Sequence, residues 1–169
     1  MSNLERERRF IVARVPDDLD SFTPSIIYQG YFLAMNGYAI RVRRISTPSA
    51  DGDEYGSIAV KGPRAADGTR IEEERYFEDP SLAGQLLRLC PRKVLKRRYA
   101  LPDTWVIDVF DWSNEGLVIA ELEGGPEIYS TDLPRYVGRE ISGETAFNNE
   151  WLAYRPWSDW SPAEKGQWT

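Results

Sequence analysis

The sequence contains no histidine and a single cysteine, Cys90. Without histidine, the protein has no imidazole zinc site, no Ser-His or Cys-His nucleophile and no histidine general base. A lone cysteine forms no intramolecular disulfide, which suits a reducing compartment. Any catalysis must therefore depend on carboxylates, lysine, arginine or tyrosine, or on a metal ion bound through oxygen.

Long apolar runs and an excess of basic charge are also missing. No segment is long and apolar enough to span a bilayer, and the charged N-terminus lacks the apolar core of a signal peptide. A net charge of −6 over 169 residues argues against a general nucleic-acid binder. Phosphate-loop, dinucleotide-binding and nucleophile-elbow motifs are absent as well. We expect a cytoplasmic protein, monomeric or homodimeric, with no membrane or nucleic-acid partner.

Alternation of polar and apolar residues is the main structural signal, and it predicts eight strands. They cover residues 4–12, 25–33, 38–45, 57–62, 69–77, 93–101, 104–112 and 116–124. One clear helix, residues 79–90, begins with Asp79 as its N-cap. Eight short strands favour an antiparallel barrel or a curled sheet, a mainly β (α+β) fold.

The last part of the chain has a different character. Residues 133–154 read as one short and one longer helix, and the Trp- and Pro-rich remainder shows no period. We therefore expect one domain over residues 1–154 and an irregular C-terminal extension over residues 155–169.

One face of nearly every predicted strand is charged, and the opposite face is apolar. The charged faces carry the acidic pairs Glu5/Glu7, Glu72/Glu74 and Glu121/Glu123, the basic pairs Arg41/Arg43 and Lys96/Arg98, and Arg9, Lys61 and Asp108. Such a face can be solvent-exposed, or its charges can form a structural lattice of ion pairs. However, same-sign pairs within one strand repel each other unless a ligand neutralises them. A barrel with its charged face inward and its helices outside accounts for both faces.

The two kinds of charged pair have complementary chemistry. Paired carboxylates are hard oxygen ligands suited to Mg²⁺ or Mn²⁺. Arginine and lysine bind phosphate oxygens, the guanidinium by bidentate contact and the ammonium as a point charge. Together they predict a site for a phosphate chain that carries a metal ion.

The order of these motifs resembles a known family. Glu5-Arg6-Glu7-Arg8-Arg9 is similar to the ExExK/R signature of the CYTH proteins, also called triphosphate tunnel metalloenzymes. IYQGYF, RVRR, VKGP, RIEEE, LKRRY, VIDVF, LVIAELE and GREISG follow in the order of that family. The resemblance implies an eight-stranded antiparallel β-barrel that forms a tunnel, and metal-dependent chemistry on a small substrate that contains a triphosphate.

The resemblance also implies roles for individual residues. The metal ligands would be Glu5, Glu7 and Glu123, with Glu121 close by. The phosphates would be held by Arg9, Arg41, Arg43, Lys61, Lys96 and Arg98. Glu72 or Glu74 would orient the attacking water or a second ion, and Asp108 is a further candidate for that role. Arg44 and Arg97 are expected to be surface charges, and Arg70 is left open between surface and site.

Hydrolysis of inorganic tripolyphosphate is the function we favour from the sequence. The chain is short, and it has no second module and no evident insertion that would recognise a base or a thiazole. Thiamine triphosphatase and class IV adenylate cyclase are the enzymatic alternatives. A polyphosphate or nucleotide sensor without catalysis is the alternative of another class, but it would tend to lose the acidic pairs.

Overall fold

The computed structural model describes residues 3–48, 52–63, 65–66 and 69–168, and for residues 3–5 it describes the backbone alone. Within these ranges the strands are β1 (Asn3–Glu5), β2 (Glu7–Val12), β3 (Ser25–Met35), β4 (Tyr38–Ser46), β5 (Glu54–Lys61), β6 (Arg70–Phe77), β7 (Arg92–Ala100), β8 (Trp105–Phe110), β9 (Val118–Glu123) and β10 (Val137–Glu140). The α-helices are α1 (Pro80–Leu89), α2 (Asn149–Leu152) and α3 (Pro162–Lys165). Short 3-10 helices are η1 (Leu19–Ser21), η2 (Trp112–Asn114), η3 (Pro126–Tyr129), η4 (Thr145–Phe147) and η5 (Trp157–Asp159).

All strands belong to one antiparallel sheet with the order β1-β6-β5-β4-β3-β7-β8-β9-β2-β10. Each of the eight predicted strands is present. Two strands are additional because the first predicted strand is divided at Arg6 and because residues 137–140 form β10. The prediction of a short helix at that place was wrong. β10 pairs with the edge of β2, opposite Val12 and Phe10, and gives that edge of the strand a partner.

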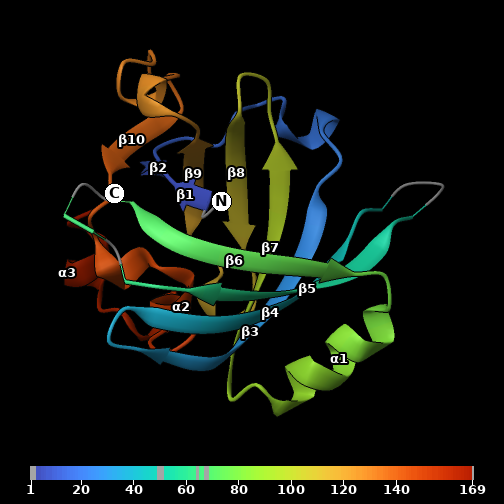
Figure 1. Cartoon of the computed structure of the whole chain (residues 1–169). Helices are drawn as coiled ribbons and strands as arrows, with labels where there is room; N and C mark the ends of the chain where they lie inside the picture. The colour runs from blue at the N-terminus through green and yellow to red at the C-terminus, as the bar shows by residue number, and fades with distance from the viewer. Residues whose placement is uncertain (1–2, 49–51, 64, 67–68, 169) are drawn as a thin grey trace.

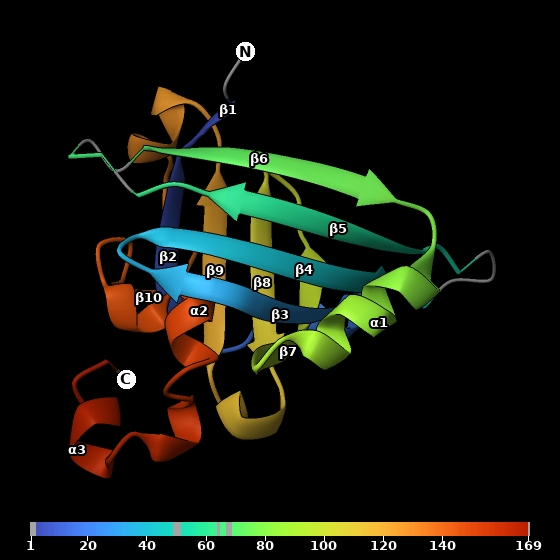
Figure 2. The same cartoon turned by 60° about the horizontal axis from the view of Figure 1, so that its bottom comes forward.

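The sheet folds over itself into two layers. In Figures 1 and 2, β3–β6 cross in front of the strands β2 and β7–β9, and the two sets of strands run at a steep angle to each other. Residues 3–12 pass from one layer to the other, since β1 pairs with β6 and β2 pairs with β9. The strand order nevertheless runs open from β1 to β10. The antiparallel, mainly β fold is therefore confirmed, while the pairing does not show a closed eight-stranded barrel.

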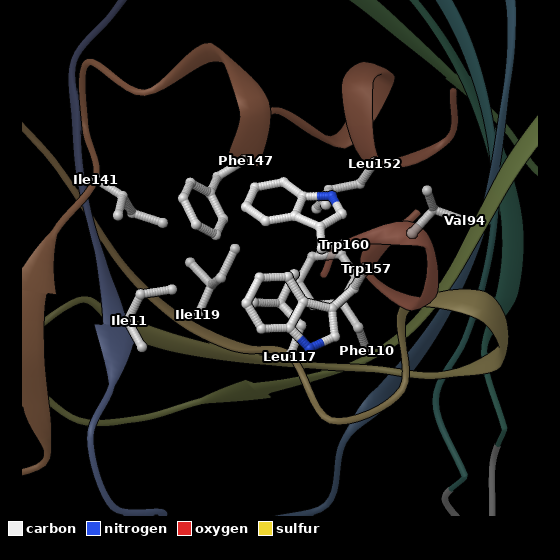
Figure 3. Packing of buried hydrophobic residues seen from close by; sticks show 10 residues of the cluster. All are labelled: Ile11, Val94, Phe110, Leu117, Ile119, Ile141, Phe147, Leu152, Trp157 and Trp160. Carbon is white, nitrogen blue, oxygen red and sulfur yellow. The ribbon is translucent and has the colours of Figure 1, made fainter. Parts of the chain in front are cut away.

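Between the layers, the inward face of the sheet is charged at one end and apolar at the other. Ile11, Phe110 and Ile119 share the face of the charged residues in β2, β8 and β9, and they pack into one cluster with the C-terminal part of the chain. Figure 3 shows this cluster: Ile11, Val94, Phe110, Leu117, Ile119, Ile141, Phe147, Leu152, Trp157 and Trp160. The segment around α2 thus fills one end of the interior. The prediction that this helix packs outside the sheet was wrong.

Other segments cover the outward faces. α1 lies over β3, β4 and β5, and Gly30 and Gly56 permit its close approach, since a Cβ at either would lie less than 3 Å from Cys90 or Ala83. The helix begins at Asp79, whose side chain accepts hydrogen bonds from the backbone of Ser81 and Leu82. On the other layer, the outward cluster consists of Phe10, Leu19, Tyr99, Trp105, Ile107, Ala120, Leu122 and Ile128. In the described part of the chain, no helix has the length and apolar character needed to cross a membrane.

Candidate functional site

A polar cavity of about 220 Å³ is lined by residues of both layers. Its lining consists of Glu7, Arg9, Tyr31, Arg41, Arg43, Lys61, Arg70, Glu72, Glu74, Tyr76, Arg98, Glu121, Glu123, Asn148, Asn149 and Glu150. Six of these side chains are basic and six are carboxylates, so their formal charges cancel. The described lining therefore combines many phosphate-binding groups with several potential metal ligands, and its formal charges sum to zero.

The pairing of β2 with β9 places two carboxylates opposite each other. Glu7 is the direct partner of Glu123, and Arg9 is the direct partner of Glu121. Side chains at directly opposed positions of an antiparallel pair lie close together, and like charges there are destabilising. The Nε of Arg9 lies 3.5 Å from a Glu7 oxygen and offsets part of this repulsion.

Across the cavity, Arg41 joins the two acidic side chains of β6. Its Nη2 lies 3.0 Å from an oxygen of Glu72 and 3.0 Å from one of Glu74. The Nζ of Lys61 lies 2.5 Å from the other Glu72 oxygen, and the hydroxyl of Ser57 donates to Glu74 at 2.6 Å. Burial raises the pKa of Glu74, but Arg41 and the other partners outweigh it, so that the pKa is below its ordinary value.

Arg43 lies beside this group and donates through Nε to the side-chain oxygen of Gln29 at 3.0 Å. Burial lowers the pKa of Arg43 to about 10, and the charges of Arg41 and Arg98 add to the effect. Its one ion pair among the described residues is a long one, with Nη1 4.0 Å from a Glu74 oxygen, so its charge is only partly compensated. Arg43 is therefore a favourable partner for an anion.

Arg98 is held from behind by Asp108. The guanidinium of Arg98 forms a bidentate pair with Asp108, with both N–O distances at 2.7 Å, and it also contacts Glu121. Lys96 contacts the same Asp108 carboxylate, and both residues are completely buried. Burial lowers the pKa of Lys96 to about 8, and the charge of Arg98 contributes. Burial opposes ionisation of Asp108, but Arg98 and Lys96 hold its pKa far below the ordinary value.

Arg9 connects the cavity to the segment before α2. It donates from Nη1 to the carbonyl of Phe147 at 3.1 Å and from Nη2 to the Asn148 side chain at 2.7 Å. Its backbone N–H donates to the Ser142 hydroxyl at 3.0 Å. Arg9 therefore positions this wall of the cavity as well as lining it.

Comparison with known proteins identifies the family. An inorganic triphosphatase of Acetivibrio thermocellus is 32% identical to this chain over 161 residues, which are 92% of this chain and 96% of that protein. The chain belongs to the inorganic triphosphatase family. No protein-family model matches it. The crystal structure of the inorganic triphosphatase NE1496 is similar with a TM-score of 0.61 at 25% identity, and the match covers 90% of this chain and 95% of that one.

A second structure of NE1496, described as a hypothetical protein, gives a TM-score of 0.60 at 25% identity over 88% of this chain and 97% of that one. Membership of the inorganic triphosphatase family supports the resemblance that the sequence motifs indicated. The roles of Glu5, Glu7 and Arg9 in the ExExR motif stay predictions.

The structure brings most of the predicted site residues into the cavity of this triphosphatase-family chain. Those that line it are Glu7, Arg9, Arg41, Arg43, Lys61, Glu72, Glu74, Arg98, Glu121 and Glu123. Lys96 and Asp108 do not line it and lie behind Arg98. The side chain of Glu5 falls outside the described part of the structure.

Sequence reasoning left Arg70 open and missed Asn148, Asn149 and Glu150. Arg70 is buried and donates to the carbonyls of Gly62 and Gly37. Its position two residues before Glu72, on the same face of the strand, was the feature of the sequence that could have indicated its place in the cavity. Asn148, Asn149 and Glu150 line the cavity from the end of η4 and from α2, and no strand periodicity indicates them. Arg44 and Arg97 pair with Glu54 and Asp111 away from the cavity, as predicted for surface charges.

The carboxylates of the cavity fit a hard divalent cation. Among the side chains that the structure describes, no three acidic, histidine or cysteine residues are grouped as a ready metal site. However, Glu7 and Glu123 lie opposite each other, and Glu121 is two residues before Glu123 on the same face of β9. These side chains supply oxygen ligands of the type that Mg²⁺ and Mn²⁺ bind. A cation between them would also remove their mutual repulsion.

Proposed function

We propose that this protein is a metal-dependent triphosphatase that hydrolyses the terminal phosphoanhydride bond of inorganic tripolyphosphate, with Mg²⁺ or Mn²⁺ as the cofactor. The observation that carries the proposal is the cavity in which basic and acidic side chains from both layers converge. It is found in a chain of the inorganic triphosphatase family.

The basic residues bind the phosphate chain. Arg41 and Arg43 on β4, Lys61 on β5 and Arg98 on β7 approach the cavity from several strands, so that each phosphate can meet at least one cation. The Nε atoms of Arg9 and Arg41 are buried and have no hydrogen-bond partner among the described residues, although the Nε of Arg9 lies at ion-pair distance, 3.5 Å, from Glu7. Buried donors of this kind are costly unless a ligand accepts from them, and phosphate oxygens are suitable acceptors.

The acidic residues Glu7, Glu121 and Glu123, with Glu5 from the same motif, hold the metal ion in this proposal. When bound, such a cation withdraws charge from the phosphate oxygens in the transition state. The charges of the described lining residues cancel, and Glu5 at this site would add one more negative charge, so a polyanion that enters the cavity needs this additional positive charge. Metal dependence therefore follows from the charge of the cavity.

Glu72 or Glu74 orients the attacking water. The depressed pKa of Glu74 keeps it ionised, which makes it a hydrogen-bond acceptor for water and only a weak base. A loose phosphoryl-transfer transition state requires position and charge stabilisation more than proton removal. No covalent enzyme intermediate is needed, in agreement with a chain that has no histidine.

Lys96 and Asp108 act on the site through Arg98 in this mechanism. Their complete burial separates them from the cavity, and the bidentate contact of Asp108 fixes the guanidinium plane of Arg98. We also propose that residues 3–12, which pair with both β6 and β9, enclose the substrate in a tunnel-like interior.

The test is phosphate release by the purified protein with Mg²⁺ or Mn²⁺, offered tripolyphosphate, ATP, thiamine triphosphate and pyrophosphate in parallel. We expect preferential cleavage of tripolyphosphate and a loss of at least about a hundredfold in Glu7→Gln, because charge stabilisation by a lost ligand is of this order. Glu73→Gln is the matched control, since Glu73 lies on β6 outside the cavity lining.

Other outcomes would change the assignment. Formation of cyclic AMP from ATP would indicate a cyclase, and preferential cleavage of thiamine triphosphate would indicate that substrate. Tripolyphosphate binding that persists in EDTA without turnover would contradict catalysis and indicate a sensor.

A further inference from the structure

A second cavity, of about 520 Å³, adjoins the polar one. The residues common to the two linings are Asn148 and Glu150. The remaining lining is largely apolar or aromatic: Ala34, Met35, Asn36, Gly37, Tyr38, Arg92, Thr145, Trp151 and Tyr154. The guanidinium of Arg92 lies 4.0 Å from the centre of the Tyr154 ring. A chain that extends beyond the polar cavity past Glu150 would leave the cluster of cations and enter an environment with few groups that bind phosphate.

Glu150 differs from the other carboxylates of the polar cavity. Glu7, Glu72, Glu74 and Glu121 each lie within ion-pair distance of an arginine. Glu150 makes no ion pair and no side-chain hydrogen bond with the residues that the structure describes. Its charge contributes to the raised pKa of Tyr31, after the effect of burial, which places it near that wall of the cavity. A negative charge that no described residue pairs with therefore lies where the two cavities meet.

The position of Glu150 is fixed by its surroundings. Phe147 and Leu152, on either side of it in the sequence, are buried in the apolar cluster of Figure 3. Arg9 holds Phe147 and Asn148, and the Asn114 amide donates to the carbonyl of Leu152 at 3.3 Å. A charge on a well-anchored segment acts at a defined place, which is the condition for a specific effect on substrate choice.

We propose that Glu150 is a specificity-determining residue that limits the length of the phosphate chain to three. This inference rests on the proposed function, because it concerns the same site. A tripolyphosphate that lies among the cations avoids Glu150, whereas a fourth phosphate would lie next to this carboxylate and would have to give up its hydration. An unpaired charge at the place where an unwanted ligand would bind is a common source of selectivity.

The experiment compares tripolyphosphate and linear tetrapolyphosphate as substrates of the wild type and of Glu150→Gln, in Mg²⁺. Glu144→Gln is the matched control, since it removes the same charge from an exposed residue that lines neither cavity. We expect the ratio of kcat/KM for tetrapolyphosphate over tripolyphosphate to rise about fivefold or more in Glu150→Gln. The kcat/KM for tripolyphosphate should stay within about twofold, and Glu144→Gln should leave the ratio unchanged.

Two results would overturn the inference and leave the proposed function standing. One is an equal change for both substrates, and the other is a large loss of tripolyphosphate hydrolysis in Glu150→Gln, which would place Glu150 among the catalytic or metal-binding groups. If the wild type hydrolyses neither compound, the proposed function fails instead. In that case calorimetry in Mg²⁺ measures the dissociation constants of tripolyphosphate and tetrapolyphosphate for the wild type and for Glu150→Gln. The variant should then bind tetrapolyphosphate more tightly relative to tripolyphosphate than the wild type does.

Discussion

Asp108 is fully buried, and its carboxylate binds two cationic side chains. Its carboxylate receives Lys96 on one side and the bidentate guanidinium of Arg98 on the other. Lys96 and Asp108 have both lost their hydration, whereas Arg98 keeps one side open to the cavity. Burying the charges of Lys96 and Asp108 is favourable only while all three partners are present. This arrangement fixes Arg98 at the cavity wall. Asp108 therefore contributes both to the stability of the fold and to the position of the Arg98 guanidinium.

Replacement of Asp108 by asparagine should therefore lower the free energy of unfolding by about 3 kcal/mol, the usual consequence of removing one partner from a buried pair. Asp111→Asn is the control: Asp111 pairs with Arg97 near the surface, and its loss should cost under about 1 kcal/mol. Both values come from urea denaturation at pH 7. Equal losses in the two variants would contradict the role given to the buried network.

At this scale, the sequence predicts which face a charge occupies but not its depth. Alternation places Lys96 and Arg98 on one face of a strand, yet the structure buries Lys96 and exposes Arg98 to the cavity. The difference arises because the same face holds Val94 and Phe110 in the apolar cluster. Lys96 lies between that cluster and the cavity. The different burial of Lys96 and Arg98 therefore depends on tertiary packing.

The C-terminal segment completes the interior of the sheet. Trp157 and Trp160 are almost fully buried, and their rings lie 4.9 Å apart. They pack with Phe147, which precedes the α2 residues of the cavity wall. The apolar end of the sheet and the position of α2 therefore depend on the same aromatic side chains.

Trp157→Ala should lower the free energy of unfolding by about 3 to 5 kcal/mol, because a large buried side chain is removed and a cavity is left. Tripolyphosphate hydrolysis should also fall, since Asn148 and Asn149 lose the support of the cluster. Trp112→Ala is the control at an exposed tryptophan, with an expected loss of about 1 kcal/mol from its edge contact with Tyr28. Thermal unfolding and phosphate release measure the two effects. A Trp157→Ala protein as stable as Trp112→Ala would contradict this role of the segment.

Strands with a clear alternation could be predicted as elements. Near the C-terminus a longer helix was predicted within residues 133–154, and the structure instead has η4 and the four-residue α2 there, together with the strand β10. β10 is only four residues long and is a strand because the edge of β2 is available to it. α2 is equally short, and packing of Phe147 and Leu152 stabilises it more than helix propensity does. Partners that lie far away in the sequence determine both elements.

At the scale of the whole molecule, the cavity joins the two layers through charge. β4, β5 and β6 contribute Arg41, Lys61, Glu72 and Glu74 from one layer, and β2, β7 and β9 contribute Glu7, Arg98 and Glu121 from the other. A ligand that contacts both groups binds the native arrangement alone, and it therefore stabilises the fold by mass action.

This argument leads to a prediction for a triphosphate analogue whose bridging oxygens are replaced by imido groups, which resists hydrolysis. With Mg²⁺, the analogue should raise the free energy of unfolding by about 2.7 kcal/mol at a concentration one hundred times its Kd. In EDTA the same analogue should stabilise the protein much less, because the charges of the described lining residues cancel and the polyanion lacks the compensating cation. Differential scanning fluorimetry with wild type, Glu7→Gln and Glu73→Gln measures this. Equal stabilisation with and without the metal would mean that the cations of the protein suffice for binding, and the acidic side chains of β2 and β9 would then need another explanation.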